Sequence, residues 1–320
     1  MNVPVIAFFN NKGGVGKTSL VYHVAWMLAE QGKRVVAVDL DPQVNLSAAF
    51  LEDDRLEKLW EEEQRAVTIY HAIQPLKRGI GDIAPPVLEA VGERLALLPG
   101  HMALSEFEDQ LSEVWPKCLD RDERAFRVLT SFWRVIQKGA EEHRAAVVLI
   151  DLGPNLGAIN RAALVASDFV VIPLGPDLFS LQGLRNLGPK LREWRQGWQE
   201  RIPRNPDPTL SLPAGSMEPI GYIVTQHSVR RDRPAKSYEK WIARIPGTYR
   251  QAVLGYDGIT QETTYPRPAG SPSLGAVREP PLLERGPGDE LEWGTDVTRD
   301  PHCFALLKHY RSLMPMAQEA

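Results

Sequence analysis

Apolar residues along this chain fall into two patterns. Short continuous apolar runs are typical of strands buried on both faces of a sheet, and they predict strands over residues 3–9, 34–39, 94–98, 145–151, 169–173 and 220–225. Apolar positions three and four residues apart predict helices over residues 18–31, 104–115, 121–142, 156–167, 178–200 and 234–245, with a short one at 303–314. Strands that alternate with helices predict an α/β fold, a doubly wound and mainly parallel β-sheet with helices on both faces.

A glycine-rich turn joins the first predicted strand to the first predicted helix. Its sequence is Asn10-Asn11-Lys12-Gly13-Gly14-Val15-Gly16-Lys17-Thr18. Glycines let backbone N–H groups turn toward phosphate oxygens, and the start of a helix adds partial positive charge. The end of the segment fits the P-loop pattern G-x-x-x-x-G-K-S/T, although Asn11 replaces its first glycine. Because a strand precedes the turn and a helix follows it, we favour a phosphate site over a turn with two solvated lysines.

The P-loop pattern assigns roles to individual side chains of this turn. Lys17 can reach the β- and γ-phosphates of a nucleotide, and the Thr18 hydroxyl can ligate Mg²⁺. Lys12 stands before the loop closes, so we expect its side chain to point away from its own nucleotide, toward a phosphate held by a second subunit. The predicted nucleotide contacts are Lys12, Gly13, Gly14, Val15, Gly16, Lys17, Thr18 and Ser19.

The spacing K-G-G-V-G-K-T resembles the deviant Walker A motif of the ParA/MinD family of P-loop ATPases. In that family the lysine equivalent to Lys12 crosses the interface of a nucleotide-sandwich dimer. The resemblance therefore implies an ATP-driven homodimer, catalytic roles for Lys12 and Lys17, and ATP or ADP with Mg²⁺ as cofactors. It also implies adenine contacts from Thr225 and Gln226, at the end of the strand over residues 220–225. The likeness covers residues 1–51, 94–104, 145–190, 218–228 and 311–317.

Acidic residues end two of the predicted strands, at the edge where open parallel sheets bind their ligands. Residues 39–47 read Asp-Leu-Asp-Pro-Gln-Val-Asn-Leu-Ser and resemble the switch I of ParA proteins, which assigns Asp41 to orient the attacking water. Asp151 ends a strand that fits a Walker B motif, whose aspartate holds Mg²⁺ with Thr18, partly through water. Gly153 then replaces the first proline of the D-x-P-P switch II. The alternative for either aspartate is to cap a following helix.

Composition bears on domain organisation and location. Of the 320 residues, 51 are glycine or proline, and 14 of these fall in residues 255–301, which lack a sustained period. We predict a single ATPase domain over residues 1–320 with insertions at about 119–144 and 255–301. Two cysteines exclude a disulfide framework. With no signal peptide and no run of about 20 apolar residues, we expect a cytoplasmic protein.

Charge is unevenly distributed in this chain, whose net charge is −4. Residues 185–250 carry thirteen basic and six acidic side chains, whereas residues 52–63 and 279–300 are acidic. A basic region in an acidic protein suits the phosphate backbone of DNA, bound without sequence preference. The predicted DNA contacts are Arg230, Arg231, Arg233, Lys236 and Lys240. The alternative is an ordinary solvated surface, which charge runs usually are.

Together these features predict a Mg²⁺-dependent ATPase of the ParA type. Its ATP dimer is expected to bind nucleoid DNA non-specifically and to segregate or position DNA or another cargo. An activating ParB-like or cargo-adaptor protein is expected to accelerate a slow hydrolysis, and no stable membrane anchor is expected. The alternatives are a MinD-like ATPase that cycles on and off a membrane, a metabolic synthetase on the same fold, and an adaptor that binds ATP but scarcely hydrolyses it.

Overall fold

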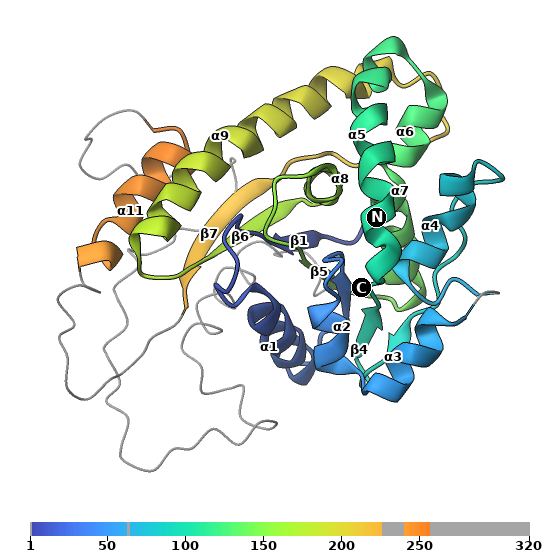
Figure 1. Ribbon diagram of the computed structural model, residues 1–320, viewed down its shortest axis with the longest axis horizontal. Helices are drawn as coiled ribbons and strands as arrows, with labels where there is room; N and C mark the ends of the chain where they lie inside the picture. Colours follow the sequence, from blue (N-terminus) through green and yellow to red (C-terminus); the bar gives the residue numbers. More distant parts are fainter. Residues whose placement is uncertain (1, 63–64, 226–239, 257–320) are drawn as a thin grey trace. The chain divides into compact units, whose positions relative to one another are not determined.

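A seven-stranded sheet forms the framework of the part of the chain that the computed structural model describes, residues 2–62, 65–225 and 240–256. Its strand order is β3-β4-β2-β5-β1-β6-β7 (Figure 1). The strands are β1 Val5–Phe8, β2 Val35–Asp39, β3 Glu89–Ala90, β4 Leu95–Leu98, β5 Val147–Asp151, β6 Phe169–Leu174 and β7 Glu218–Val224. Six of them are the predicted strands, and these run parallel to one another. The seventh, β3, is antiparallel to β4, and its two residues are too few to form a sequence pattern.

Helices cover both faces of the sheet (Figure 1). The α-helices are α1 Lys17–Glu30, α2 Asn45–Phe50, α3 Asp53–Trp60, α4 Ile69–Arg78, α5 Glu108–Lys117, α6 Glu123–Leu129, α7 Ser131–Glu142, α8 Ala158–Val165, α9 Leu178–Arg201 and α11 Ile245–Thr248. The 3-10 turns η1 Met102–Phe107, η2 Cys118–Asp120 and η3 Ile202–Arg204 and the π-helix η4 Tyr249–Val253 adjoin them. Crossovers between parallel strands are right-handed, so connections toward β3 and toward β7 place their helices on opposite faces. Accordingly, α1 lies on one face, and α7, α8 and α9 lie on the other.

The predicted fold class is confirmed by this layered arrangement. Every residue of β1, β2, β4 and β5 is buried, as the continuous apolar runs predict. The segment 119–144, predicted to be an insertion, contributes to the same core through α6 and α7. Its Phe132 packs on Phe107 with ring centres 5.9 Å apart, and its Phe126 packs on Trp198.

Several helices differ from the prediction. The single helix predicted over 121–142 is divided into α6 and α7 at Thr130, where φ is −93° and ψ is 5°. The Thr130 hydroxyl donates to the Phe126 carbonyl (2.7 Å), which ends α6 locally. The short helices α2, α3 and α4 are absent from the prediction. Residues 234–239 of the predicted helix 234–245, the helix 303–314 and residues 257–301 lie outside the described residues.

The parallel strands end at one edge of the sheet, and the turns there carry the predicted site residues. β1 lies between β5 and β6. Its own connection leads toward β2, whereas the connection from β5 leads across β1 to β6. The turn after β1 therefore lies where the winding of the sheet reverses, which is the usual ligand position in an open α/β sheet.

Candidate nucleotide-binding site

The turn between β1 and α1 has the backbone of a phosphate-binding loop. Gly14 and Gly16 have φ angles of 71° and 74°, in the left-handed region that favours glycine. Gly16 is the N-cap of α1, and no side chain forms a capping hydrogen bond there. The first N–H groups of α1 and the positive end of its dipole are therefore directed at an incoming anion.

Lys17 lies inside this loop. Only 7% of the residue is exposed, and its Nζ donates a hydrogen bond to the backbone oxygen of Lys12 (3.2 Å). Burial lowers the pKa of Lys17, whereas the charges of Asp151 and Asp41 act in the opposite direction. An ammonium group held in this way gains a strong charged partner when a phosphate enters the loop.

Thr18 and Asp151 meet beside the loop. The Thr18 hydroxyl donates to Asp151 Oδ2 at 2.6 Å. Asp151 is fully buried at the end of β5, and its Oδ1 has no hydrogen-bond partner among the described residues. Burial, and next the charge of Asp39, raise the pKa of Asp151 to about 8. An unsatisfied carboxylate oxygen beside a hydroxyl is the kind of oxygen ligand that Mg²⁺ prefers, so these two residues fit the predicted magnesium site.

Magnesium differs from other metals in how few protein ligands it requires. Within residues 2–62, 65–225 and 240–256, no three His, Cys, Asp or Glu side chains are grouped so as to hold a metal ion. Mg²⁺ needs no such cage, because it binds through one or two carboxylates and completes its octahedron with water and substrate phosphates.

Asp41 lies in the turn after β2 and is 6% exposed. Its Oδ1 accepts a hydrogen bond from the backbone N–H of Gln43 (3.0 Å), which fixes the carboxylate close to its own backbone. Switch II reaches it directly, because a Cβ at Gly153 would lie 3.1 Å from Asp41 Oδ1. Neither Asp41 nor Asp151 is a helix N-cap: Val44 precedes α2 and Gly157 precedes α8.

The side chain of Lys12 leaves the loop and forms an ion pair with Asp177, which lies in the turn after β6. Asp177 is also the N-cap of α9, since its Oδ1 accepts a hydrogen bond from the backbone N–H of Ser180 (2.8 Å). The Lys12 Nζ lies 5.9 Å from the ring centre of Phe179, which is 72% exposed. The two lysines of the loop thus have different surroundings.

The remaining predicted contacts divide between described and undescribed parts of the chain. The Thr225 hydroxyl donates to the backbone oxygens of Val15 (2.8 Å) and Leu174 (3.2 Å), so Thr225 joins the end of β7 to the P-loop. Ser19 lies exposed in the first turn of α1. Of the predicted DNA contacts Lys240 is exposed, with its Nζ 5.2 Å from the ring centre of Trp241. Gln226 and the predicted DNA contacts Arg230, Arg231, Arg233 and Lys236 lie outside the described residues.

Two further carboxylates belong to the site although the sequence assigns them no role. Asp39 is fully buried next to Asp151 in the β2–β5 ladder. Its Oδ2 accepts hydrogen bonds from the N–H and the hydroxyl of Ser47 (2.8 Å each), and burial raises its pKa to about 6. Asp39 could have been noted from its place at a strand end. Asp177 could have been recognised only as an N-cap, because its distance from Lys12 along the chain hides the pairing.

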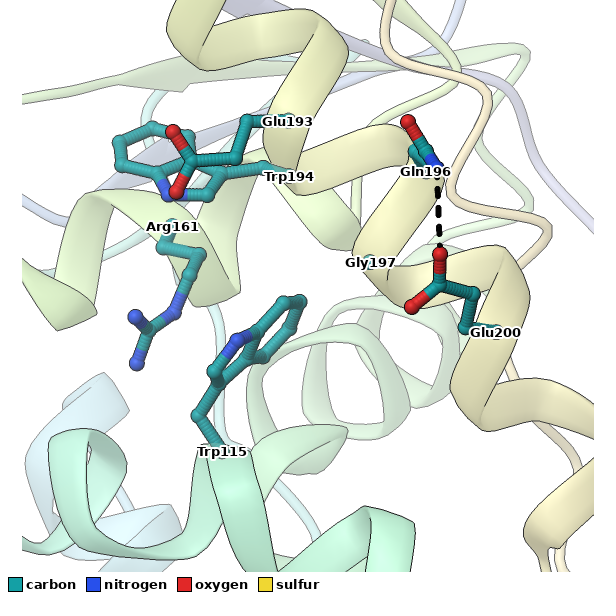
Figure 2. Close-up of a pocket in the computed structure, with 7 residues that line it drawn as sticks. All are labelled: Trp115, Arg161, Glu193, Trp194, Gln196, Gly197 and Glu200. Carbon is teal, nitrogen blue, oxygen red and sulfur yellow. Dashed lines mark hydrogen bonds between the residues drawn. The ribbon is translucent and has the colours of Figure 1, made fainter.

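Away from this site, a hollow of about 290 Å³ lies between α5, α8 and α9 (Figure 2). Its lining includes Trp115, Arg161, Trp194 and Glu200, none of which belongs to the predicted nucleotide site. The guanidinium carbon of Arg161 lies 4.5 Å from the ring centre of Trp115. In the part of the chain that the structure describes, no helix combines the length and the apolar character needed to cross a bilayer.

Comparisons with known proteins agree with this geometry. Residues 3–202 match the AAA domain family AAA_31. The chain is 32% identical over 246 residues to Protein IncC of Escherichia coli, covering 77% of this chain and 57% of that one. It is 30% identical over 183 residues to the sporulation initiation inhibitor protein Soj of Bacillus subtilis, covering 57% of this chain and 62% of Soj. A virulence plasmid ParA family protein of Chlamydia psittaci is 27% identical over 186 residues, and the match covers 57% of this chain and 61% of that protein.

The chain thus spans about 57–62% of the length of these curated relatives. Among solved structures, a protein of Corynebacterium diphtheriae has a TM-score of 0.58 and 34% identity, with 63% of this chain and 69% of that chain covered. An ATP complex of McdA from Cyanothece has a TM-score of 0.54 at 18% identity, over 78% of this chain and 81% of that chain, which supports the fold alone. From the family match and these relatives, the chain belongs to the AAA domain family AAA_31 and to the ParA/MinD family of P-loop ATPases.

Proposed function

We propose that this chain is a nucleotide-driven switch of the partition type. It binds ATP with Mg²⁺, closes face to face with a second copy, binds DNA without sequence preference as the ATP dimer, and releases DNA after hydrolysis. The observation that carries this proposal is the separation of two lysines within one loop. Lys17 is buried in the loop, whereas the ammonium group of Lys12 lies outside it, where a second subunit can reach it.

The chemistry we assign to the site is positioning and charge stabilisation. Thr18 and Asp151 would hold Mg²⁺, which when bound supplies positive charge to the phosphate oxygens. Lys17 binds the β- and γ-phosphates. Asp41 orients a water whose oxygen attacks the γ-phosphorus while the bond to the β–γ bridging oxygen breaks, giving ADP and phosphate. Because Asp41 is buried and held by the Gln43 N–H, it can orient a water without moving far.

The proposal includes DNA and a protein partner. The excess of basic residues between 185 and 250 supports a phosphate-binding surface, and the names of the relatives include a virulence plasmid protein. We propose that Arg230, Arg231, Arg233, Lys236 and Lys240 contact DNA, that the protein acts in the cytoplasm on the nucleoid, and that an adaptor protein accelerates a slow basal hydrolysis. The cargo is DNA or a body carried on DNA.

The dimer is tested by light scattering with ATP, with ADP and without nucleotide. Asp41→Ala removes the carboxylate that we expect to orient water, so this variant should accumulate as a dimer with ATP and remain a monomer with ADP. Lys12→Ala should stay monomeric with either nucleotide. A monomeric Asp41→Ala protein at saturating ATP contradicts the face-to-face dimer.

DNA binding is tested with duplexes of unrelated sequence over a range of salt concentrations. We expect DNA binding in the presence of ATP, and no binding with ADP or without nucleotide. The logarithm of the binding constant should fall less steeply with the logarithm of the salt concentration in the triple variant Arg230→Glu, Arg231→Glu, Arg233→Glu, since each lost phosphate contact lowers that slope by about one. An unchanged slope places the DNA surface elsewhere on the chain. Lipid vesicles serve as the competing arm, and ATP-dependent binding to vesicles without binding to DNA contradicts the partition function.

A further inference from the structure

Lys12 is held within its own subunit by Asp177. Their side chains form an ion pair in which the lysine side chain is 28% exposed and the aspartate 36% exposed. The other oxygen of the same carboxylate accepts a hydrogen bond from the Ser180 N–H, in the first turn of α9. Burial raises the pKa of Asp177, but the hydrogen bonds from Lys12 and Ser180 outweigh it and lower that pKa overall. One carboxylate thus joins the P-loop to the start of α9.

Neighbouring contacts fix the same region of the P-loop against the end of β6 and against α9. The Asn10 amide donates to the Pro173 carbonyl (2.7 Å), and the Lys12 N–H donates to Asn10 Oδ1 (3.0 Å). A Cβ at Gly183 of α9 would lie 3.1 Å from Asn11 Oδ1, so the loop and the helix are in close contact. The backbone position of Lys12 is therefore set independently of its ion pair. Only the side chain of Lys12 has to move for its ammonium group to leave Asp177 and bind another anion.

We propose that Asp177 restrains Lys12 in the single subunit, and that closure of a second copy exchanges this carboxylate for the phosphates of the partner's ATP. The inference rests on the proposed ATP dimer and adds a residue that sets when the dimer forms. Lys12 is paired with an anion before and after the exchange. The negative charge of Asp177 also remains stabilised after the exchange, because the Ser180 N–H and the positive end of α9 stay in place.

The exchange makes Asp177 a competitor of the partner's phosphates. Both ligands are anions, and Lys12 can satisfy only one of them fully. A carboxylate in an ion pair that is partly open to water is a weak competitor, so it should delay dimer formation without preventing it. Removing the charge of Asp177 should then allow the ATP dimer to form at a lower protein concentration.

The first test uses Asp177→Asn. Asparagine remains a good N-cap and keeps the acceptor for the Ser180 N–H, but it carries no charge and cannot form an ion pair with an ammonium group. We expect the protein concentration at half-dimerisation with ATP to fall about threefold to fivefold, the effect of an exposed ion pair. The matched control is Asp122→Asn at the N-cap of α6, which accepts from the Ala125 N–H (3.1 Å) and should not change that concentration.

The second test measures the restraint itself, in the absence of nucleotide. The rate at which an amine-acylating reagent modifies Lys12 is followed by mass spectrometry, with the exposed Lys58 as the internal standard. Loss of the ion pair in Asp177→Asn should raise the modification rate of Lys12 relative to Lys58 about threefold. Weaker capping of α9 alone would not raise the rate at Lys12 specifically.

The outcomes separate the two proposals. An unchanged Lys12 rate overturns the restraint even if the ATP dimer forms. An ATP dimer whose half-dimerisation concentration is the same in wild type and Asp177→Asn overturns the exchange and leaves the proposed function standing. If neither the wild type nor Asp41→Ala forms any ATP dimer, the proposed function fails and the exchange fails with it.

Discussion

Gly153 of switch II lies close to the Asp41 carboxylate. A Cβ at this position would lie 3.1 Å from Asp41 Oδ1 and 3.3 Å from its Cγ, which is tighter than ordinary packing allows. Gly153→Ala should therefore displace the carboxylate that orients water while leaving Lys17 and Thr18 in place. We expect the turnover rate for ATP to fall about tenfold, the effect of a barrier higher by about 1.4 kcal/mol, with ATP affinity changed less than about twofold.

The measurement for Gly153→Ala is steady-state ATP hydrolysis together with equilibrium binding of ATP. Gly221→Ala in β7 is the control, since a Cβ there has no atom within 4 Å. Equal loss of affinity and turnover in Gly153→Ala would mean that the substitution disturbs the whole loop rather than Asp41.

Lys17→Ala tests the phosphate site. The ammonium group is buried and already hydrogen-bonded within the loop, so its loss removes a charge directed at the nucleotide. We expect ATP binding to weaken about 100-fold, from the loss of one strong charge-assisted interaction. Isothermal titration calorimetry measures this, and exposed Lys58→Ala should bind ATP like the wild type. Tight ATP binding by Lys17→Ala would refute the P-loop assignment.

Local spacing explains which site residues could be predicted from sequence. Lys17 and Thr18 follow their loop directly and Asp151 ends a buried strand, so chain order alone places them. Asp177 could not be predicted as a partner of Lys12. Only the pairing of β1 with β6 brings the turns that carry the two residues together, and the sequence does not state that pairing.

Among the elements, α9 and η4 approach each other closely. A Cβ at Gly188 of α9 would overlap the carbonyl oxygen of Ala252 and lie 2.8 Å from the Cα of Val253. Because the obstacle is backbone, Gly188→Ala should push η4 away and destabilise the fold by about 1–3 kcal/mol. Chemical denaturation measures the change. Gly247→Ala in α11 is the matched control, because its Cβ meets no atom within 4 Å and helix propensity should make it neutral or slightly stabilising.

Strands were more predictable than helices because burial on both faces leaves continuous apolar runs. β2 and β5 are buried along their whole length and match their predicted runs. In contrast, α2, α3 and α4, of six, eight and ten residues, are missing from the prediction. Length alone does not account for this, because α5 and α8 have ten and eight residues and were predicted. The division at Thr130 was also hidden, since the apolar repeat continues across it and only the hydroxyl contact with Phe126 marks the break.

At the scale of the whole molecule, a network of charges connects the consecutive helices α6 and α7 with two segments distant from them in sequence. Asp82 Oδ2 accepts from Arg127 of α6 (2.9 Å) and from Arg134 of α7 (2.7 Å). Arg127 also pairs with Asp207, which follows η3, at 2.8 Å. Burial raises the pKa of Asp82, but the hydrogen bonds, first that from Arg134, outweigh it and lower the pKa to about 2. This network should therefore contribute to stability.

The stabilisation by Asp82 should depend on pH in one direction. Its pKa is lower in the folded protein than the ordinary aspartate value of 3.8, so the contribution is present above that pH and is lost as the pH falls toward 2. Since the side chain is 39% exposed, solvent screening reduces the effect, and we expect Asp82→Asn to cost about 1 kcal/mol at pH 7.

Urea denaturation at several pH values between 7 and 2 measures the contribution of Asp82. The difference between wild type and Asp82→Asn should shrink as the pH falls below 4. Glu113→Gln, which breaks only an exposed pair with Lys117 on one helix, is the control and should leave stability nearly unchanged at every pH. A difference that does not vary with pH would mean that Asp82 contributes by packing rather than by charge.

The α/β class and the position of the site at one edge of the sheet follow from the order of strands and motifs along the chain. The neighbours of each strand do not follow, because strand order is settled by crossover handedness and packing. The hollow between α5, α8 and α9 was equally unpredictable. Trp115 and Trp194 come from helices separated in sequence by two strands, and only the folded layers place them together.

The length of α9 has an optical consequence. Its 24 residues span roughly 36 Å. The helix begins beside Asp177, the partner of Lys12, and carries Trp194 and Trp198 toward its other end, where the guanidinium carbon of Arg201 lies 3.9 Å from the ring centre of Trp115. Figure 2 shows Trp194 and Trp115 at that end. Indole emission responds to the position of nearby charges, so a tilt of α9 that begins at Asp177 would alter the emission at its other end. Release of Lys12 from Asp177 should therefore change the intrinsic tryptophan fluorescence, so that the unlabelled protein reports its own nucleotide state to a spectrometer.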